Sequence, residues 1–382
     1  MEKAKHILIV AGEASGDLHA ADLAGALKQI NPALTISGVG GMLMRKAGVE
    51  ICYDIKELAV LGLFDVLKKL PRFIALQKLI LKKMEEEKID AIILVDFSGF
   101  NLRLAKKINQ KIPAIYYISP QVWASRTGRV KTIKRYISKM IVILKFEEEF
   151  YQNFRIDAAF VGHPLLDIVK PAMEKKVFMD EFKLSESKTT IALLPGSRRS
   201  EIENILPIML KTSVFLQNSI KEIQFVIAKA PGVDWDIYNS KIKDFKNIDL
   251  KVIEGKTYDC LGLADFCLVA SGTATLETAI MQKPLVVIYK MGLLNYLFYR
   301  PQVKVNYIGM VNILAGRQIV PEFVQFNTEP REIAARVLEI LENPSEMERI
   351  KKDLGQVKSL LGEKGASHRA AQIIVDMLGK GN

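Results

Sequence analysis

Cysteine is scarce in this chain and is not arranged for disulfides. The 382 residues contain three cysteines, Cys52, Cys260 and Cys267, and no CxxC pair. An odd number of isolated cysteines does not form the disulfide framework that small secreted domains depend on. The cysteine usage therefore predicts a protein of the reducing cytoplasm.

Histidine and glycine patterns argue against two further kinds of site. The four histidines lie far apart, without the HExxH spacing of a zinc site. Two glycine-rich stretches, residues 12–17 and 38–41, do not match the GxGxxG dinucleotide fingerprint. We therefore expect no metal ligands and no cofactor.

Long apolar segments are also missing. No uncharged apolar run approaches the roughly 18 residues that a transmembrane helix needs. The apolar residues 6–10 are too few for a signal peptide and are typical of a first buried strand. We expect a cytoplasmic protein that does not cross a membrane.

Positive charge is in excess, with a net charge of +11. Such a balance favours nucleic acid, an anionic membrane or a phosphorylated ligand, and lysine-rich solvated surfaces are the alternative. No known nucleic-acid-binding module is present, so we expect no nucleic-acid partner.

Short apolar runs alternate with amphipathic, helix-period segments along most of the chain. This alternation indicates βαβ units and parallel sheets, and 382 residues favour two domains. We predict an α/β protein with two doubly wound, Rossmann-like domains facing across a cleft and a helical C-terminal tail. The expected parts are an N-terminal acceptor domain (1–168), a linker (169–188), a nucleotide-binding domain (189–355), and C-terminal helices that pack back on the first domain (356–382).

Two turns in the second half have the composition of a nucleotide-diphosphate site. Gly196 and Arg198 follow one apolar strand, and the turn Ser271, Gly272 and Thr273 follows another. Backbone N–H groups at a helix N-terminus bind phosphate well. Arg198 is suited to neutralising a diphosphate, and Glu277, about one turn into the helix, to accepting hydrogen bonds from a ribose diol.

Asp96 stands at the end of the strongly apolar run 91–95. A carboxylate at the C-terminal end of a strand is well placed as a general base, and turn or helix capping is the alternative. Asn101 follows in the next helix and either caps or binds ligand.

The loop after the first strand also carries polar groups. Glu13, Ser15 and Asp17 lie there, close to His19. The position at the ligand-binding edge of a sheet favours a functional role. The alternative is an ordinary turn in which Asp17 caps the next helix.

Trp123, one of two tryptophans, follows another strand. It is suited to lining a sugar or acyl site, although a tryptophan is more often part of the core. The five basic residues between 126 and 135 favour a solvated helix face, with phosphate or anionic lipid as the alternative.

Two apolar segments edged by basic residues, 58–73 and 291–300, have the composition of a membrane interface. Core packing or a contact with a second copy of the chain is the alternative for both. The side chains that we assign to membrane or acyl contact are Leu61, Leu63, Phe64, Val66, Leu67, Leu297 and Phe298.

Seven short motifs occur in a fixed order: residues 12–17, 96–101, 119–124, 162–165, 194–198, 271–277 and 312–317. In this order they closely resemble the lipid-A-disaccharide synthase family, inverting glycosyltransferases of GT-B architecture, over nearly the whole chain. The resemblance implies transfer from UDP-2,3-diacylglucosamine to 2,3-diacylglucosamine 1-phosphate. The implied products are lipid A disaccharide 1-phosphate and UDP, formed without a metal at the inner-membrane surface.

The resemblance also assigns roles. Asp96 matches the family's base, which deprotonates the acceptor 6-hydroxyl. Asn312 and Arg317 match its donor-site loop, and the loop around Glu13 matches an acceptor-side loop. Two departures stand out: Ser125 replaces a common aromatic, which puts sugar or acyl contacts there in doubt, and Gly99 replaces an acid found in some members, which leaves Asp96 as the sole base.

Two other functions remain as alternatives. An isomerase like UDP-N-acetylglucosamine 2-epimerase shares the architecture, but it needs no acyl site. A peripheral membrane protein that binds sugar nucleotides without turnover is the non-enzymatic alternative, against which the intact Asp96 argues.

Overall fold

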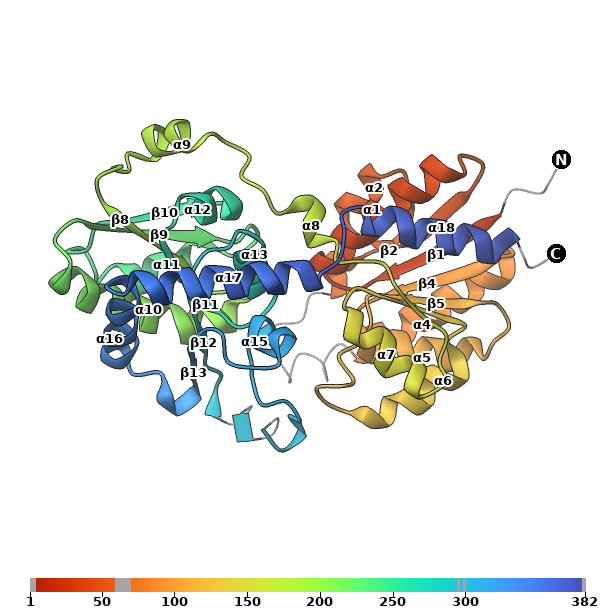
Figure 1. Cartoon of the computed structure of the whole chain (residues 1–382). Coiled ribbons are helices and arrows are strands. Elements are labelled where there is room, and N and C mark those ends of the chain that lie inside the picture. Colours follow the sequence, from red (N-terminus) through yellow and green to blue (C-terminus); the bar gives the residue numbers. More distant parts are fainter. Residues whose placement is uncertain (1–4, 59–69, 294–295, 298–299, 380–382) are drawn as a thin grey trace. The chain divides into compact units, whose positions relative to one another are not determined.

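The computed structural model describes residues 5–58, 70–293, 296–297 and 300–379. The chain divides into two compact units (Figure 1). The first contains Met1–Asp167 and Leu361–Asn382, and the second contains Ile168–Leu360. Within the described ranges, no helix combines the length and the apolar character needed to cross a bilayer.

The first unit is built on a seven-stranded sheet of order β3-β2-β1-β4-β5-β6-β7. Every neighbouring pair of strands is parallel. The strands are β1 (His6–Ala11), β2 (Thr35–Gly40), β3 (Glu50–Asp54), β4 (Ala91–Val95), β5 (Ala114–Tyr117), β6 (Lys139–Val142) and β7 (Ala158–Phe160).

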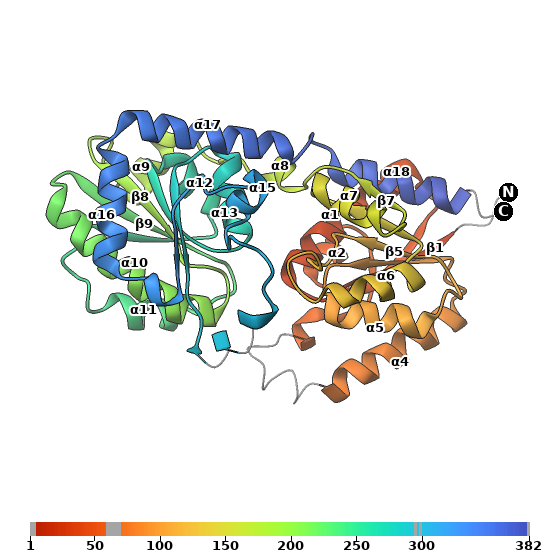
Figure 2. The same cartoon turned by 60° about the horizontal axis from the view of Figure 1, so that its bottom comes forward.

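Helices cover both faces of this sheet, with α4, α5 and α6 on one face and α1 and α18 on the other (Figure 2). Helix α18 belongs to the C-terminal tail and packs against α1. The helical elements are α1 (Ala14–Ile30), α2 (Met42–Lys46), η1 (Ile55–Leu58), α4 (Leu70–Glu86), α5 (Ser98–Ile108), η2 (Thr127–Arg129), α6 (Val130–Tyr136), α7 (Lys145–Asn153), α8 (Leu165–Ile168) and α18 (Ala366–Gly379).

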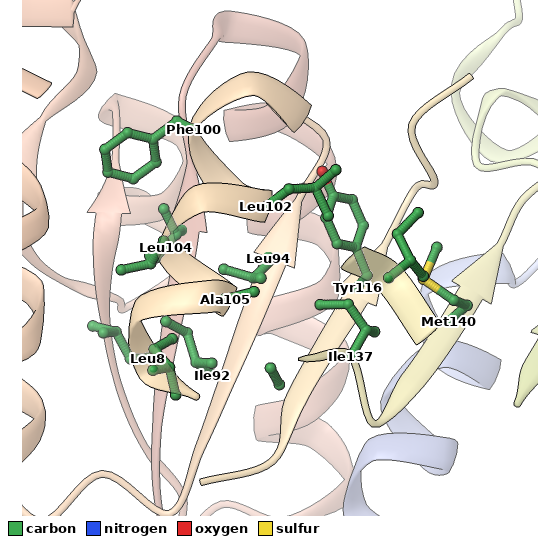
Figure 3. Close-up of a cluster of buried hydrophobic side chains, with 14 of the residues drawn as sticks. Leu8, Ile92, Leu94, Phe100, Leu102, Leu104, Ala105, Tyr116, Ile137 and Met140 are labelled. Carbon is green, nitrogen blue, oxygen red and sulfur yellow. The ribbon is translucent and has the colours of Figure 1, made fainter. Parts of the chain in front are cut away.

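The core of the first unit follows from the alternation of side chains along its central strands. Leu8, Ile92 and Leu94 point to one face, where they meet α5 side chains such as Leu104 (Figure 3). The intervening residues, such as Ile93, are buried on the other face. Strands that are buried on both faces are typical of parallel sheets, and this explains the continuous apolar runs in the sequence.

The second unit has a six-stranded parallel sheet of order β10-β9-β8-β11-β12-β13. Its strands are β8 (Thr189–Leu194), β9 (Ile223–Lys229), β10 (Leu250–Glu254), β11 (Phe266–Ala270), β12 (Leu285–Tyr289) and β13 (Glu322–Val324). Helix α10 packs against α11 and α16, and α13 packs against α15 and α17. The helical elements are α9 (Lys175–Phe182), α10 (Arg199–Ser219), α11 (Trp235–Ile242), α12 (Thr257–Leu263), α13 (Thr273–Ile280), η3 (Arg300–Gln302), α15 (Met310–Ala315), η4 (Gln325–Asn327), α16 (Pro330–Leu341) and α17 (Pro344–Leu360).

The predicted fold class is confirmed, because both sheets are parallel and wound in both directions from a central strand pair. Strands β3 and β13 were not predicted from the sequence. Both are edge strands with half-exposed residues, so neither has the buried apolar run that marks a central strand. The segment that we expected to be a linker contains α9, and Asn312, which we placed in a donor-site loop, lies in α15.

Asp17 joins the first two helices of the chain. It lies within α1 and is buried, and its carboxylate accepts hydrogen bonds from three backbone N–H groups at the start of α2: Gly41 at 2.6 Å, Leu43 at 3.0 Å and Met44 at 3.2 Å. A carboxylate at a helix N-terminus satisfies donors that have no partner within the helix. Asp17 therefore caps α2, one helix later than the sequence alternative placed it.

We predict that Asp17→Ala lowers the free energy of unfolding of the first unit by about 2 kcal/mol, because buried N–H groups lose their acceptor. The measurement is urea unfolding in a Trp235→Phe background, where Trp123 is the sole tryptophan and reports on the first unit. Asp157→Ala, at an exposed carboxylate before β7, is the control and should leave the unfolding midpoint unchanged. Equal midpoints for the two variants would contradict the capping role.

Candidate functional site

Each sheet has one place where its winding direction reverses. In the first sheet β1 pairs with both β2 and β4, and in the second β8 pairs with both β9 and β11. Ligands of doubly wound sheets bind beyond the C-terminal ends of the strands at this point. The loops that follow β1, β4, β8 and β11 include the predicted segments around Glu13, Asp96, Arg198 and Ser271.

Asp96 lies in a strained turn directly after β4. Asp96 and Phe97 both have left-handed backbone conformations, with φ of 46° and 44°. Such residues cost about 1–3 kcal/mol each and persist only where their surroundings hold them. The Tyr116 hydroxyl and Asn101 Nδ2, at 2.9 Å, both donate to the Asp96 carbonyl, and the Asp96 N–H donates to the Tyr117 carbonyl at 3.2 Å.

Asn101 holds this edge of the sheet together. Its side chain is fully buried, and Nδ2 also donates to the Val95 carbonyl at 3.2 Å. The neighbouring turn is shaped to fit, because a Cβ on Gly12 would lie 2.2 Å from the ring of Phe97. Asn101 therefore positions the backbone of Asp96, and this contact gives it a structural role.

The predicted acceptor-side loop divides into two parts. Glu13 and Ser15 are exposed at the start of α1, whereas Asp17 is buried and turned toward α2. Glu13 and Ser15 are therefore the members of this loop that remain accessible to a ligand.

Trp123 is held by a carboxyl group that the sequence analysis missed. Glu147, in the first turn of α7, is buried and accepts hydrogen bonds from Ser119 Oγ at 2.7 Å and Trp123 Nε1 at 3.0 Å. Burial raises the pKa of Glu147 to about 7, and these two hydrogen bonds oppose the shift. The indole N–H thus anchors the loop 119–125, and the ring also packs edge-on against Phe146.

In the second unit, Gly196 and Arg198 form the turn between β8 and α10. Gly196 has a φ of 110°, and a Cβ there would lie 2.3 Å from Glu201 Oε2. Glu201 closes the turn by accepting from the N–H groups of Ser197 at 2.9 Å and Arg198 at 3.2 Å. The Arg198 guanidinium contacts Glu201 Oε1 at 3.1 Å, with 68% of its side chain exposed.

The turn Ser271, Gly272 and Thr273 leads from β11 into α13. Gly272 is the N-cap with a φ of 147°, a conformation that favours glycine. Gly272 and Thr273 are exposed, so the N-terminus of α13 is accessible. Ser271 Oγ donates to the Ile308 carbonyl at 2.8 Å, which ties this turn to the loop that precedes α15.

Glu277 lies one turn into α13 and is paired with a residue that the sequence analysis missed. The Tyr258 hydroxyl, from the first turn of α12, donates to Glu277 Oε1 at 3.2 Å. Burial raises the pKa of Glu277, and the hydrogen bond from Tyr258 opposes the shift. No sequence pattern around Tyr258 indicates a functional residue, so the sequence analysis did not select it.

Asn312 and Arg317 make structural contacts in the second unit. Asn312 is fully buried, with Nδ2 donating to Glu322 Oε1 at 2.8 Å and Oδ1 accepting from the Ile319 N–H at 2.8 Å. Arg317 forms an ion pair with Asp353 at 2.7 Å and is half-exposed. Asn312 therefore shapes the loop from within, and Arg317 is the residue of the two that reaches the surface.

The predicted membrane-contact residues are described only in part. Leu297 is 61% exposed, and the neighbouring Leu293 is also exposed. The others lie outside the described residues: Leu61, Leu63, Phe64, Val66, Leu67 and Phe298.

Solved structures confirm the architecture. The chain is similar to a putative UDP-N-acetylglucosamine 2-epimerase from Listeria monocytogenes, with a TM-score of 0.67, 12% identity, and coverage of 100% of this chain and 98% of that one. It is also similar to a glycosyltransferase from Rickettsia africae, with a TM-score of 0.59, 12% identity and full coverage of both chains. At such low identity these similarities show a shared fold and nothing of the reaction.

Sequence comparisons identify the family. Residues 7–377 match the family model described as lipid-A-disaccharide synthetase. The chain is 42% identical over 377 residues to the lipid-A-disaccharide synthase of Syntrophus aciditrophicus, covering 98% of each chain. It is 39% identical over 382 residues to that of Myxococcus xanthus, covering all of each chain. The chain therefore belongs to the lipid-A-disaccharide synthase family, the glycosyltransferases of lipid A biosynthesis.

Proposed function

We propose that the chain transfers 2,3-diacylglucosamine from its UDP donor to the 6-hydroxyl of 2,3-diacylglucosamine 1-phosphate, with inversion at the anomeric carbon. The acceptor oxygen forms the new bond to the donor C1 as the bond from C1 to UDP breaks. The proton of the hydroxyl passes to a base, and UDP leaves with both electrons of the broken bond. Family membership supports the substrates, and the turn at Asp96 carries the proposal.

Asp96 is the proposed base. It stands where the first sheet reverses its winding, and its backbone is held in a conformation that costs free energy. Strain of this kind is retained where a side chain must keep one orientation. A positioned carboxylate typically contributes about 10²–10⁴-fold to a rate by general base catalysis.

The proposed donor site lies in the second unit. The exposed N-terminus of α13 and the guanidinium of Arg198 face the charge that develops on the leaving diphosphate. A diphosphate offers Arg198 a stronger partner than the single carboxylate of Glu201, since an ion pair made by an exposed guanidinium contributes little. Glu277 accepts hydrogen bonds from the ribose hydroxyls, with Tyr258 fixing its orientation.

We further propose that the chain binds the cytoplasmic surface of the inner membrane. Leu297 and Phe326, 61% and 72% exposed, are apolar side chains of the second unit, and Tyr296 packs its ring against Phe326. Lys290 and Arg300 lie nearby in the sequence. Apolar side chains flanked by cations suit the interface of an anionic bilayer.

We predict that Asp96→Asn lowers kcat by about 10²–10⁴-fold while UDP binding persists. Asparagine has nearly the same size and tolerates the left-handed conformation, so the turn is kept. The assay is acceptor-dependent release of UDP, with UDP affinity measured by calorimetry. Asp157→Asn removes an exposed carboxylate at the opposite edge of the same sheet and serves as the control. Retention of the full rate by Asp96→Asn would exclude Asp96 as the base.

Arg198→Ala should weaken UDP binding about tenfold, because a charge-assisted contact with the diphosphate is lost. The matched control is Arg199→Ala, which removes the neighbouring exposed guanidinium that pairs with Glu203. Calorimetric titration with UDP measures both variants. An equal effect of the two substitutions would indicate a general loss of positive charge and would remove Arg198 from the diphosphate site.

Leu297→Asp is expected to reduce co-sedimentation with vesicles of phosphatidylethanolamine and phosphatidylglycerol at least tenfold, because a charge enters the apolar interface. Leu360→Asp makes the same change at an exposed leucine at the end of α17 and should leave binding intact. If Leu297→Asp instead lowers the molecular mass measured by light scattering and leaves vesicle binding unchanged, this surface contacts a second copy of the chain and the membrane proposal fails.

A further inference from the structure

Three arginines gather beside the turn that carries Asp96. Arg103 lies on α5. Arg126 lies just before η2, and Arg129 is the last residue of η2, directly before α6, which packs against α5. Burial lowers the pKa of Arg129, and the positive charges of Arg126 and Arg103 lower it further. Among the described residues, no carboxylate forms an ion pair with Arg129 or Arg103. Arg129 and Arg103 thus lie close to other positive charges without an ion pair to a carboxylate of the described residues.

Arg129 is oriented toward the start of α5. Its Nη1 donates to Ser98 Oγ at 2.9 Å, and Ser98 is the first residue of that helix, two positions after Asp96. The positive end of the α5 dipole adds to the same field. Arg129 is half-buried, so its guanidinium is partly desolvated and its interaction with an anion is stronger than at an exposed site.

The hydroxyl of Tyr116 connects this cluster with the proposed base. The pKa of Tyr116 is raised, first by burial and then by the charge of Asp96, and the charge of Arg129 opposes the shift. Asp96 and Arg129 therefore act on the same buried hydroxyl from nearby positions. An anion held by Arg129 lies close to any hydroxyl that Asp96 deprotonates.

We propose that Arg129, supported by Arg103, Arg126 and Ser98, binds the phosphomonoester of the acceptor sugar. This inference rests on the proposed function, because it takes the 1-phosphate of the acceptor as its ligand. On the glucosamine ring, C1 and C5 flank the ring oxygen, and the 6-hydroxyl is carried by C6, the carbon attached to C5. A phosphate site must therefore adjoin the base, as the Arg129 cluster adjoins Asp96.

Guanidinium groups fit this ligand. A guanidinium donates two parallel hydrogen bonds to a phosphate, and a dianion relieves the repulsion among the three cations. The cluster selects an acceptor with a phosphate at C1 over the same sugar without one. It thereby separates the acceptor from the donor, whose C1 carries a diphosphate linked to a nucleoside.

The test compares two acceptors, 2,3-diacylglucosamine 1-phosphate and the same sugar without phosphate. Arg129→Gln should raise the KM for the phosphorylated acceptor about 10–100-fold and leave the donor KM unchanged. The rate with the phosphate-free acceptor should be the same as in the unaltered enzyme. Arg129→Lys keeps the charge without the planar fork and should recover part of the loss. Arg135→Gln, on the same helix α6, is the control.

Equal losses with both acceptors, or no change with either, would overturn the proposal. So would reduced binding of anionic vesicles by Arg129→Gln with an unchanged acceptor KM, since the cluster would then contact lipid headgroups. Calorimetry with glucosamine 1-phosphate, which requires no turnover, separates this inference from the proposed function. Tenfold weaker binding by Arg129→Gln would support the phosphate site even if the enzyme released no UDP, and equal binding would reject it.

Discussion

The turn after β4 depends on one constraint, the burial of its backbone carbonyl groups. Asp96 and Phe97 adopt left-handed conformations, and the Asp96 carbonyl accepts hydrogen bonds from two side chains of the protein. Tyr116 and Asn101 satisfy it with a hydroxyl and an amide donor. A buried carbonyl left without donors costs more than a typical hydrogen bond contributes, so these partners fix the turn. The orientation of the candidate base, and the placement of Ser98 and Arg129 beside it, follow from that arrangement.

Carboxylates perform a related task in several loops at the ligand edges of the two sheets. Asp17 closes the start of α2, Glu201 closes the turn at Gly196, and Glu322 accepts from the Gly309 N–H at 2.9 Å before α15. Glu147 holds Ser119 and Trp123 in the first unit. Each carboxylate accepts hydrogen bonds from loop groups that have no partner in a helix or strand. These hydrogen bonds hold the irregular backbone in place at the ligand edge of the sheet.

Sequence alone predicted the fold class because central parallel strands are buried on both faces and appear as continuous apolar runs. The edge strands β3 and β13 lack that signal. Among the candidate residues, Asp96 and the turn at Gly272 could be proposed from the sequence because strand ends and small-residue turns are local patterns. Glu147 and Tyr258 were missed because their importance comes from contacts across 24 and 19 residues, which no local pattern encodes.

The same reasoning explains why Asp17, Asn101 and Asn312 were assigned to ligand binding. Each is a short polar residue in a family motif, and such residues serve ligands and buried backbone equally well. The burial of the side chain distinguishes a residue that bonds the backbone from one that is available to a ligand. Asp17 and Asn312 use their polar atoms on the protein backbone, and Asn101 is fully buried, so these side chains have little to offer a substrate. Arg198 and Arg129, in contrast, keep guanidinium groups that a phosphate can engage. We therefore propose that the charged residues at the surface of each edge bind the substrates, and that the buried amides and carboxylates beneath them keep those residues in place.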